Sequence, residues 1–226
     1  MIEIRALTKS FTLYNQGGAE IPVLAGAALH VAPGECVALT GASGSGKSTL
    51  MRMIWGNYLL ASGSIRVGDL ELAEAEPRQI IALRRRTLGY VSQFLRVVPR
   101  VPTHEVVAEP LRVLGVSAPE SRIRAEAMLA RLNLPRGLWG LSPTTFSGGE
   151  QQRVNIARGF VHPYAALLLD EPTASLDAKN REVVLALIEE AKARGAAILG
   201  IFHDEAARAR VADRELDVTS FTPRQA

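Results

Sequence analysis

A glycine-rich loop constrains this chain more than any other feature of its sequence. It follows the short apolar run Cys36–Thr40 and precedes a stretch, residues 48–55, that is compatible with a helix. The loop matches the pattern G-x-x-x-x-G-K-S, in which glycines let successive backbone N–H groups approach phosphate oxygens. The sequence therefore predicts a strand, a phosphate-binding loop and a helix, rather than a flexible glycine–serine linker. The expected phosphate contacts are Gly41, Ala42, Ser43, Gly44, Ser45, Gly46, Lys47, Ser48 and Thr49.

Two side chains at the end of this loop add charge and a metal ligand. Lys47 is expected to place its ammonium group against the outer phosphates of a nucleotide. Ser48 offers a hydroxyl to Mg²⁺, and the helix that follows directs the positive end of its dipole toward the same anion. We therefore expect ATP and Mg²⁺ to bind here.

Two adjacent carboxylates follow another apolar run. The segment Ala165–Leu169 has the length of a buried strand, and Asp170 and Glu171 come directly after it. Ligands of open parallel sheets bind at the carboxyl ends of strands, which is also where the phosphate loop begins. We expect Asp170 to hold Mg²⁺, directly or through water, and Glu171 to polarise the water that attacks a γ-phosphate. Without the loop, an ordinary strand exit with two solvated acids would explain the pair equally well.

A second glycine-containing helix start lies further along the chain. Residues 146–153 read Phe-Ser-Gly-Gly-Glu-Gln-Gln-Arg, and Ser147 and Glu150 have the spacing of a capping box. A cap does not need two glycines, however. Gly148 and Gly149 leave the first turn without side chains, so that a phosphate could reach its N–H groups. Two such helix starts beside a single phosphate loop predict a dimer, in which each copy offers its second motif to the nucleotide of the other.

The order of apolar segments predicts the fold class. Strand-like runs come first, a mainly helical stretch follows, and strand and helix alternate again from residue 165 onward. Such alternation predicts an α/β fold, with a parallel sheet covered by helices and a helical part inserted. We expect one domain over residues 1–226, with a core at about 1–93 and 164–226 and the helical part at about 94–163.

Two helices can be specified in more detail. Ser117 and Glu120 have capping-box spacing, and the helix that they open is expected to bury Ile123, Ala127 and Ala130 along one stripe. A later helix over residues 181–194 is ended by Gly195. Its expected apolar face consists of Val184, Leu187, Ile188 and Ala191.

Composition narrows the classes of partner. The formal net charge is +3 over 226 residues, which does not indicate nucleic-acid binding. Cys36 is the only cysteine and lies in an apolar run, so we expect a buried thiol in a reducing compartment. No apolar run approaches the roughly 20 residues of a membrane span, and we expect a cytoplasmic protein. The run Arg84–Arg86 is interpreted as a solvated helix face.

Together these motifs resemble the nucleotide-binding domains of ABC ATPases, over residues 2–215. The segment Ser147–Gln151 is similar to the family signature, usually written LSGGQ, with Phe146 in place of leucine and Glu150 in place of glutamine. The resemblance implies a P-loop fold with an antiparallel β part at the N-terminus, a mainly parallel core sheet and an inserted helical part. It also implies a homodimer in which Ser147, Gly148, Gly149, Glu150 and Asp177 contact the ATP bound by the other copy.

The resemblance assigns further positions. Phe11 matches the aromatic residue that stacks on adenine, although a place in the core is a competing interpretation. Gln93 matches the glutamine that senses Mg²⁺ and γ-phosphate, and Ser175–Asp177 matches the loop that crosses the dimer interface. His203, at the end of an apolar strand, matches the histidine that contacts γ-phosphate. ATP hydrolysis is therefore implied, with Glu171 and His203 as catalytic residues and Ser48, Gln93 and Asp170 as metal ligands.

A narrower resemblance concerns the assembly in which the chain works. Residues 91–100, 146–160, 174–180 and 200–206 look similar to the L subunit of bacterial carbon–phosphorus lyase, a soluble phosphonate-degrading complex. That would imply association with the ribose 1-methylphosphonate 5-triphosphate synthase step and with a second ABC subunit. The alternative is the ATPase of a membrane transporter of the lipoprotein-release or macrolide-export type, whose permease inserts a helix near Gln93–Pro110. Arg96 and Arg100 either present charge to the partner or are solvated surface residues.

A third class, the DNA-repair and chromosome ATPases, is excluded by spacing. The resemblance to that class would require a long coiled-coil insertion, and Lys47 and Ser147 lie too close in the sequence for one. Translation-factor relatives carry two ATPase domains in each chain, whereas this chain has one.

Overall fold

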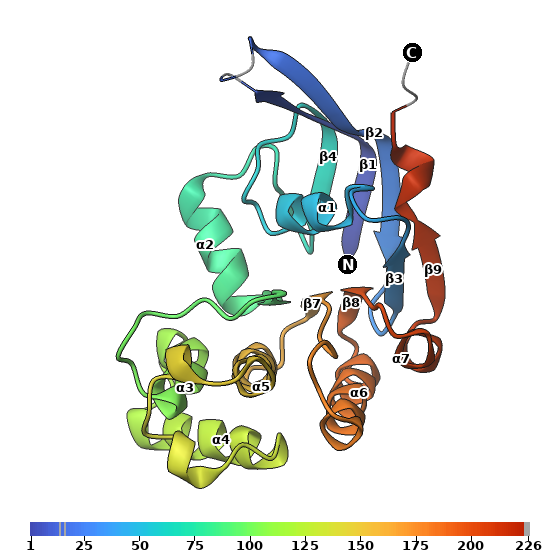
Figure 1. The fold of residues 1–226 in the computed structure, drawn as a ribbon. Coiled ribbons are helices and arrows are strands. Elements are labelled where there is room, and N and C mark those ends of the chain that lie inside the picture. The colour runs from blue at the N-terminus through green and yellow to red at the C-terminus, as the bar shows by residue number, and fades with distance from the viewer. Residues whose placement is uncertain (14, 16, 224–226) are drawn as a thin grey trace.

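A parallel sheet forms the centre of the molecule. The structure is a computed structural model that describes residues 1–13, 15 and 17–223. Five strands pair in the order β6-β7-β8-β3-β9, and every neighbouring pair is parallel (Figure 1). The sheet confirms the expected α/β fold with a parallel core. Its strands are β3 (Cys36–Thr40), β6 (Leu88–Val91), β7 (Ala166–Asp170), β8 (Ala197–Ile201) and β9 (Arg214–Asp217).

An antiparallel sheet stands beside the parallel one, as the resemblance to ABC ATPases implied. Its strands pair in the order β2-β1-β4-β5. The first strand is longer than the expected segment 2–7, because it continues past irregular pairing around Leu7 to Leu13. The four strands are β1 (Ile2–Leu13), β2 (Ala19–Val31), β4 (Ser62–Val67) and β5 (Leu70–Glu71).

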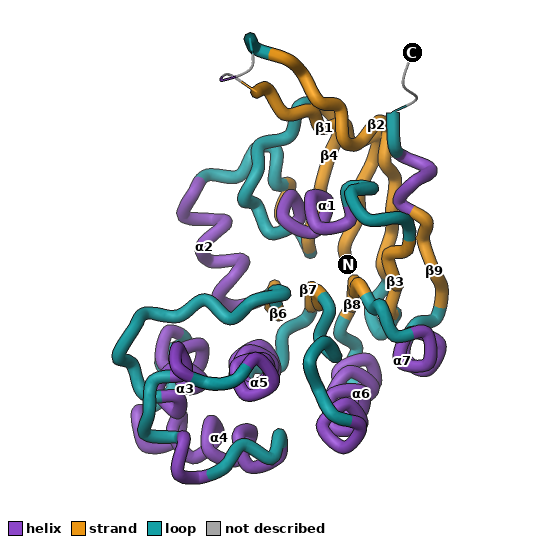
Figure 2. Tube along the Cα trace, viewed as in Figure 1, coloured by secondary structure: helices purple, strands orange, loops and turns teal. Residues whose placement is uncertain are grey.

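Helices cover the parallel sheet and fill the segment between β6 and β7 (Figure 2). The helix α3 packs against α4 and α5, and α6 packs against α7. The helices are α1 (Lys47–Ile54), α2 (Pro77–Arg86), α3 (Thr103–Val113), α4 (Ala118–Arg131), α5 (Gly148–Phe160), α6 (Ala178–Ala193) and α7 (Glu205–Val211), with 3-10 turns η2 (Arg136–Leu138), η3 (Pro143–Thr145) and η4 (Val218–Phe221).

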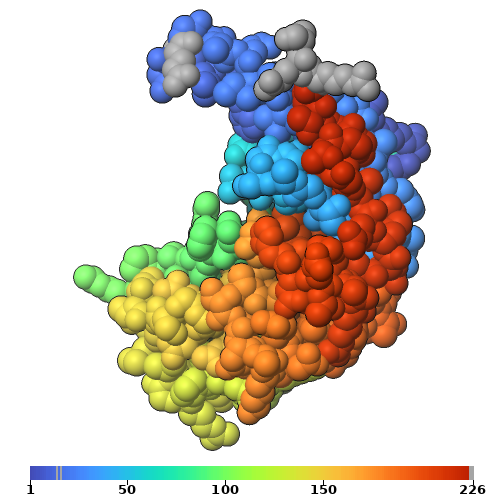
Figure 3. All heavy atoms as spheres, turned by 45° about the vertical axis from the view of Figure 1, so that its right-hand side comes forward, coloured from blue at the N-terminus to red at the C-terminus, as the bar shows by residue number. Residues whose placement is uncertain are grey.

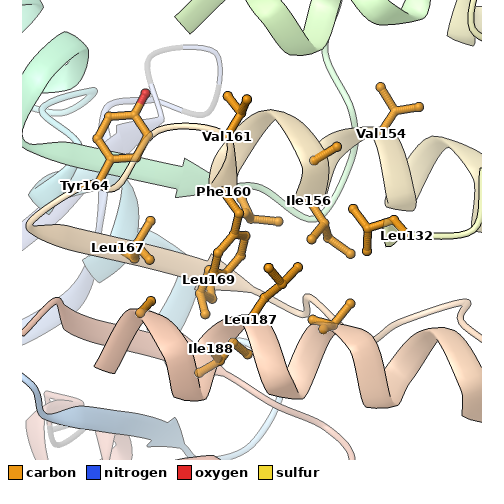
Figure 4. Packing of buried hydrophobic residues seen from close by; sticks show 14 of the residues in the cluster. Leu132, Val154, Ile156, Phe160, Val161, Tyr164, Leu167, Leu169, Leu187 and Ile188 are labelled. Carbon is orange, nitrogen blue, oxygen red and sulfur yellow. The ribbon is translucent and has the colours of Figure 1, made fainter. Parts of the chain in front are cut away.

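The strand β7 has apolar side chains on both faces of the sheet. Leu168 belongs to a cluster with α1 and the antiparallel sheet, whereas Leu167 and Leu169 belong to a second cluster with α5 and α6. Figure 4 shows Leu167 and Leu169 between the side chains of these two helices. Because side chains alternate along a strand, burial on both faces requires the continuous apolar run that the sequence contains.

The helix α1 is held between the two sheets. Its buried residues, Leu50, Met51, Met53 and Ile54, are in the same cluster as Ile65 of β4 and Leu168 of β7. The phosphate loop that precedes α1 is therefore attached to a helix whose position is set by both sheets. In the space-filling view, the parts of the chain on either side of this region enclose a hollow on one side of the molecule (Figure 3).

The prediction of which residues α4 buries is wrong. Ile123, Ala127 and Ala130 are exposed, and the helix instead buries Ser121, Ala125 and Leu129. Ser121 can enter the interior because its hydroxyl donates to the carbonyl of Val116 at 3.3 Å, and a hydrogen-bonded hydroxyl does not oppose burial. The cap is half formed, since Ser117 accepts from the Glu120 amide at 3.4 Å. By contrast, all four residues expected on the apolar face of α6 are buried.

None of the helices among the described residues is long and apolar enough to cross a membrane.

Truncating a side chain between the two sheets should destabilise the protein. Leu168 is 0% exposed, so Leu168→Ala is expected to lower the free energy of unfolding by about 2–5 kcal/mol, through lost burial and a residual cavity. Urea denaturation followed by circular dichroism measures this. The control is Leu59→Ala, at a side chain that is 87% exposed, which should change stability by less than about 0.5 kcal/mol. Equal effects would contradict the described packing.

Cys36 should be chemically silent while the protein is folded. The thiol is fully buried, and burial raises its pKa to about 12. At pH 8 the reactive thiolate is therefore scarce, as well as inaccessible. Iodoacetamide labelling followed by mass spectrometry is expected to be negligible in buffer and complete in urea. Rapid labelling in buffer would show that β3 opens far more readily than its burial indicates.

Candidate functional site

Internal hydrogen bonds hold the phosphate loop together, and α1 begins at its Lys47. Gly44 and Gly46 have φ of +80° and +99°, a region that favours glycine. The amide of Ser45 donates to the carbonyl of Ala42 at 3.2 Å. Lys47 Nζ donates to the carbonyls of Gly41 at 2.6 Å and Ala42 at 2.8 Å, so the ammonium group lies against the concave backbone of the loop.

The loop fits a bound phosphate. Ser45 Oγ is buried and has no hydrogen-bond partner in the described structure, which is costly unless a ligand supplies one. The helix α1 has no side-chain cap at its N-terminus and no acidic residue in its first turn, so its first N–H groups are free to bind an anion. A methyl group added at Gly44 would meet no atom within 4 Å, and this side of the loop is open.

Asp170 is the buried end of β7. It is 4% exposed, and its Oδ2 accepts a hydrogen bond from the Tyr90 hydroxyl at 3.3 Å. Burial, and then the neighbouring charge of Glu171, raises the pKa of Asp170. A cation beside this carboxylate would favour its charged form, which suits the expected role as a metal ligand.

The side chains of Gln93 and His203 meet at the carboxylate of Glu171. Its Oε1 lies 2.8 Å from His203 Nε2 and accepts from Gln93 Nε2 at 3.4 Å. Glu171 has a φ of +55° and donates its amide to the carbonyl of Ile201 at 3.0 Å. The three residues follow β6, β7 and β8, which are neighbours in the sheet. The structure thus brings together residues that are 78 and 32 positions apart in sequence.

This cluster has the arrangement that a general base needs. The Glu171 side chain is 21% exposed, whereas that of His203 is 71% exposed, so the carboxylate is held by the protein but lies close to water. A carboxylate whose orientation is fixed by hydrogen bonds can position and polarise a water molecule. The roles of Gln93, Glu171 and His203 nevertheless stay predictions.

The second glycine motif opens α5 as a capping box. Ser147 Oγ accepts from the Glu150 amide at 3.4 Å, and Glu150 Oε2 accepts from the Ser147 amide at 2.9 Å and from its hydroxyl at 2.7 Å. These bonds lower the pKa of Glu150. A methyl group at Gly149 would lie 2.8 Å from the carbonyl oxygen of Ser175, whereas one at Gly148 would meet nothing within 4 Å. Gly149 therefore serves packing within the chain, and Gly148 faces open space.

Some predicted site residues lie apart from the phosphate loop. Among the described residues, no hydrogen bond joins Ser147 to the loop, and Asp177 caps α6 by accepting from the Asn180 amide at 2.8 Å. Phe11 is only partly buried and belongs to neither core cluster. It packs edge-on against Tyr58, with ring centroids 5.2 Å apart. Its contact with adenine, and the contacts of Ser147 and Asp177 across a dimer, stay predictions.

Three site residues were missed by the sequence analysis. Tyr90 bonds Asp170, and Gln152 donates to the carbonyls of Glu171 at 3.2 Å and Pro172 at 3.3 Å. Asp217 ends β9 beside the phosphate loop, and hydrogen bonds from Thr219, with a smaller contribution from the Lys47 charge, hold its pKa below the usual value. Only Gln152 left a signal, as a polar residue inside a helix of buried neighbours, because the other two depend on strand pairing.

Sequence comparison shows which known proteins this chain is similar to. A family model described as "ABC transporter" matches residues 24–174. The chain is 38% identical to the lipoprotein-releasing system ATP-binding protein LolD of Maricaulis maris, over 90% of this chain and 88% of that protein. It is 38% identical to the macrolide export protein MacB of Burkholderia thailandensis, over 90% of this chain, but spans only 31% of that protein's length. The pyoverdine export protein PvdT of Pseudomonas aeruginosa is 37% identical and is also spanned over 31% of its length.

Solved structures share the fold. The dimeric post-hydrolysis state of the ATP-binding cassette MJ0796, bound to ADP and Pi, superposes with a TM-score of 0.88 at 27% identity, covering 97% of this chain and 95% of that one. The dimeric structure of MJ0796 as a bacterial ABC transporter cassette superposes with the same TM-score at 28% identity.

The two glycines of the second motif should respond differently to alanine. Gly149→Ala forces a methyl group against the Ser175 carbonyl oxygen and is expected to lower the free energy of unfolding by about 1–3 kcal/mol, the usual effect of overpacking. Gly148→Ala meets open space and should leave stability unchanged or raise it by up to about 1 kcal/mol, because alanine favours helix. Thermal and urea denaturation compare the pair. If Gly149→Ala is as stable as Gly148→Ala, the contact between α5 and the Ser175 loop is wrong.

Proposed function

The chain belongs to the ABC transporter family of ATP-binding domains, and on this premise we propose that it is the ATP-hydrolysing subunit of a membrane exporter. The observation that carries the proposal is the cluster of Gln93, Glu171 and His203 at neighbouring strand ends. The phosphate loop follows β3, which pairs with β8 in the same sheet. A phosphate anchor and a hydrogen-bonded carboxylate at one sheet edge are the parts that phosphoryl transfer to water requires.

Binding of ATP is assigned to the loop and its surroundings. The backbone N–H groups of residues 41–49 and the ammonium group of Lys47 hold the phosphates, and Phe11 supplies an aromatic face for the adenine ring. Ser48, Gln93 and Asp170 hold Mg²⁺. The metal, when bound, neutralises charge that develops on the phosphate oxygens.

Hydrolysis is assigned to Glu171 and His203. The carboxylate of Glu171 orients the attacking water and accepts its proton. His203 holds that carboxylate through the 2.8 Å contact to Oε1, and we expect it also to contact the γ-phosphate. The positive φ of Glu171 turns the side chain away from the direction that the strand would give it, and the bond from its amide to Ile201 maintains this backbone conformation.

The active form is proposed to be a homodimer. The dimeric cassettes at 27% and 28% identity support it. The exposed first turn of α5 supports it too, because a methyl group added at Gly148 would meet nothing within 4 Å. In such a dimer, Ser147, Gly148, Gly149, Glu150 and Asp177 would contact the ATP of the other copy. The division into a core of about 1–93 and 164–226 and a helical part of about 94–163 is part of the same proposal.

The exporter assignment replaces the carbon–phosphorus lyase interpretation. The relatives described above are named for lipoprotein release, macrolide export and pyoverdine export, which favours the transporter alternative, and they lend no support to phosphonate catabolism. A permease is the partner that this assignment requires. It would dock at the segment that follows Gln93, where residues including Val97, Val98, Val101 and Val113 line a hollow of about 880 Å³.

Copurification tests the assembly. The tagged chain, extracted in detergent from the membranes of its own host, is expected to retain a permease that mass spectrometry identifies. Retention of soluble phosphonate-degrading enzymes in its place would overturn the exporter assignment and restore the lyase interpretation.

The Glu171→Gln variant tests the catalytic role. It should bind ATP with unchanged affinity but hydrolyse it about 10²–10⁴-fold more slowly, the usual contribution of a general base. It should also accumulate as an ATP-bound dimer, measured by light scattering after gel filtration with Mg·ATP. The control Glu205→Gln changes a side chain that is 88% exposed on α7 and should retain the normal rate. Normal hydrolysis by Glu171→Gln would remove Glu171 from the mechanism.

A further inference from the structure

Among the described residues, the hydroxyl of Tyr90 is the only side-chain group that donates to the carboxylate of Asp170. It lies 3.3 Å from Oδ2, and Asp170 is 4% exposed. A buried carboxylate without a donor is costly, so Tyr90 supplies a contact that Asp170 needs. The other oxygen, Oδ1, accepts no side-chain hydrogen bond within the described part of the chain and is left for a further partner.

The strand register explains why these two side chains meet. Tyr90 lies opposite Leu168 in the parallel pair of β6 and β7 (Figure 2). Opposite residues of two paired strands share a face of the sheet, and so do residues two positions apart in one strand. Tyr90, Leu168 and Asp170 therefore lie on one face, which is the face that packs against α1.

The ring of Tyr90 is held on its other side by the end of α1. It packs on Trp55, the C-cap of that helix, with ring centroids 5.3 Å apart and an angle of 53° between the planes. Trp55 is held in turn by Arg84 of α2, whose guanidinium lies 4.9 Å from the ring centroid and donates to the Trp55 carbonyl at 2.8 Å. Contacts with two helices thus restrict where the Tyr90 hydroxyl can lie.

The same contacts correct one expectation from the sequence. The interpretation of Arg84–Arg86 as a solvated helix face is wrong for Arg84, which packs on Trp55 and whose pKa is lowered by burial. Arg85 and Arg86 are exposed. The three arginines differ because successive residues point about 100° apart around a helix.

Tyr90 also connects the elements that carry two of the expected metal ligands. Asp170 ends β7, and Ser48 is the second residue of α1. Mg²⁺ demands near-ideal octahedral geometry, and residues that hydrogen-bond a metal ligand orient it. At 3.3 Å the bond from Tyr90 is longer than is usual for a hydroxyl donor, so its effect is to direct the carboxylate more than to stabilise the fold.

We propose that Tyr90 is a positioning residue for Mg²⁺, which holds Oδ2 of Asp170 and thereby leaves Oδ1 to the metal. The inference rests on the metal role proposed for Asp170 and deepens it, because it assigns the residue that orients this ligand. Tyr90 acts through Asp170 and takes no part in the reaction itself.

The variant Tyr90→Phe tests the role, because it removes the hydroxyl and keeps the ring on Trp55. The probe is Mn²⁺, which takes the same oxygen ligands as Mg²⁺, added to the chain saturated with a non-hydrolysable ATP analogue. Electron paramagnetic resonance measures the free Mn²⁺, and its affinity is expected to fall about tenfold, as for other lost partners of a metal ligand. Unchanged Mn²⁺ affinity would overturn the inference.

Hydrolysis gives a second readout of the same variant. The Mg²⁺ concentration that gives the half-maximal rate should rise by about the same factor, whereas the rate at saturating Mg²⁺ should stay near that of the unchanged chain. A merely structural role for Tyr90 would instead lower the rate at every Mg²⁺ concentration, and that result would also overturn the inference.

Tyr164 supplies the matched control. It is buried, and its ring lies against β6, since a methyl group added at Gly89 would meet Tyr164 Cδ2 at 2.5 Å. Its hydroxyl makes no hydrogen bond to any described residue, so Tyr164→Phe removes a hydroxyl near the same strand without touching Asp170. The control should bind Mn²⁺ normally. A loss equal to that of Tyr90→Phe would show that packing around β6, and not the bond to Asp170, governs the metal.

The variant Asp170→Asn separates this inference from the proposal on which it rests. It should weaken Mn²⁺ binding, and adding Tyr90→Phe to it should have little further effect, because the carboxylate through which Tyr90 acts is gone. Additive losses would overturn the role of Tyr90. If Asp170→Asn binds Mn²⁺ as tightly as the unchanged chain, the metal role of Asp170 itself fails. If Asp170→Asn weakens binding and Tyr90→Phe does not, only the role of Tyr90 fails.

Discussion

Parallel pairing of β7 with β8, and of β8 with β3, is the constraint on which the site depends. Asp170 lies opposite Ile201, and Ala38 lies opposite Gly200, so the three strands end at one edge of the sheet. The amide of Glu171 continues this pairing by one further bond to the Ile201 carbonyl. A shift of one residue would turn every side chain to the opposite face, and it would move Asp170 and Glu171 out of their present positions at this edge.

The same sheet positions the phosphate loop through α1. The buried side chains of that helix pack between the parallel and the antiparallel sheets, so the loop before it is held at the sheet edge. In the described part of the chain, no hydrogen bond joins this loop to Asp170 or Glu171. This leaves polar groups free for a ligand, of which the orphaned hydroxyl of Ser45 is the clearest. A stable core thus supports a loop whose polar groups are not all satisfied within the protein.

The helix α5 connects the second glycine motif to the catalytic cluster. It begins at the second glycine motif, and its buried Gln152 and Asn155 donate to the carbonyls of Glu171 and Ser92. One helix therefore contacts both chain segments that supply the catalytic cluster, and its Arg158 lines the hollow proposed for the permease. Movement of α5 would displace the catalytic carboxylate, the segment before Gln93 and the proposed partner surface. These parts would move with the helix because the buried polar contacts between them are costly to break.

The sequence by itself determined the local features: the strand before the phosphate loop, the capping box of α5, the apolar face of α6 and the burial of Cys36. Each of these depends on residues that are neighbours along one element, so periodicity and spacing reveal them. The tertiary structure alone decided that α4 buries Ser121 in place of Ile123, that Tyr90 meets Asp170, and that Arg84 packs on Trp55 while Arg85 and Arg86 are exposed. Those outcomes depend on which elements pack together, because contacts between distant segments, and not the pattern within one segment, determine which face of a helix is buried and which strand ends meet.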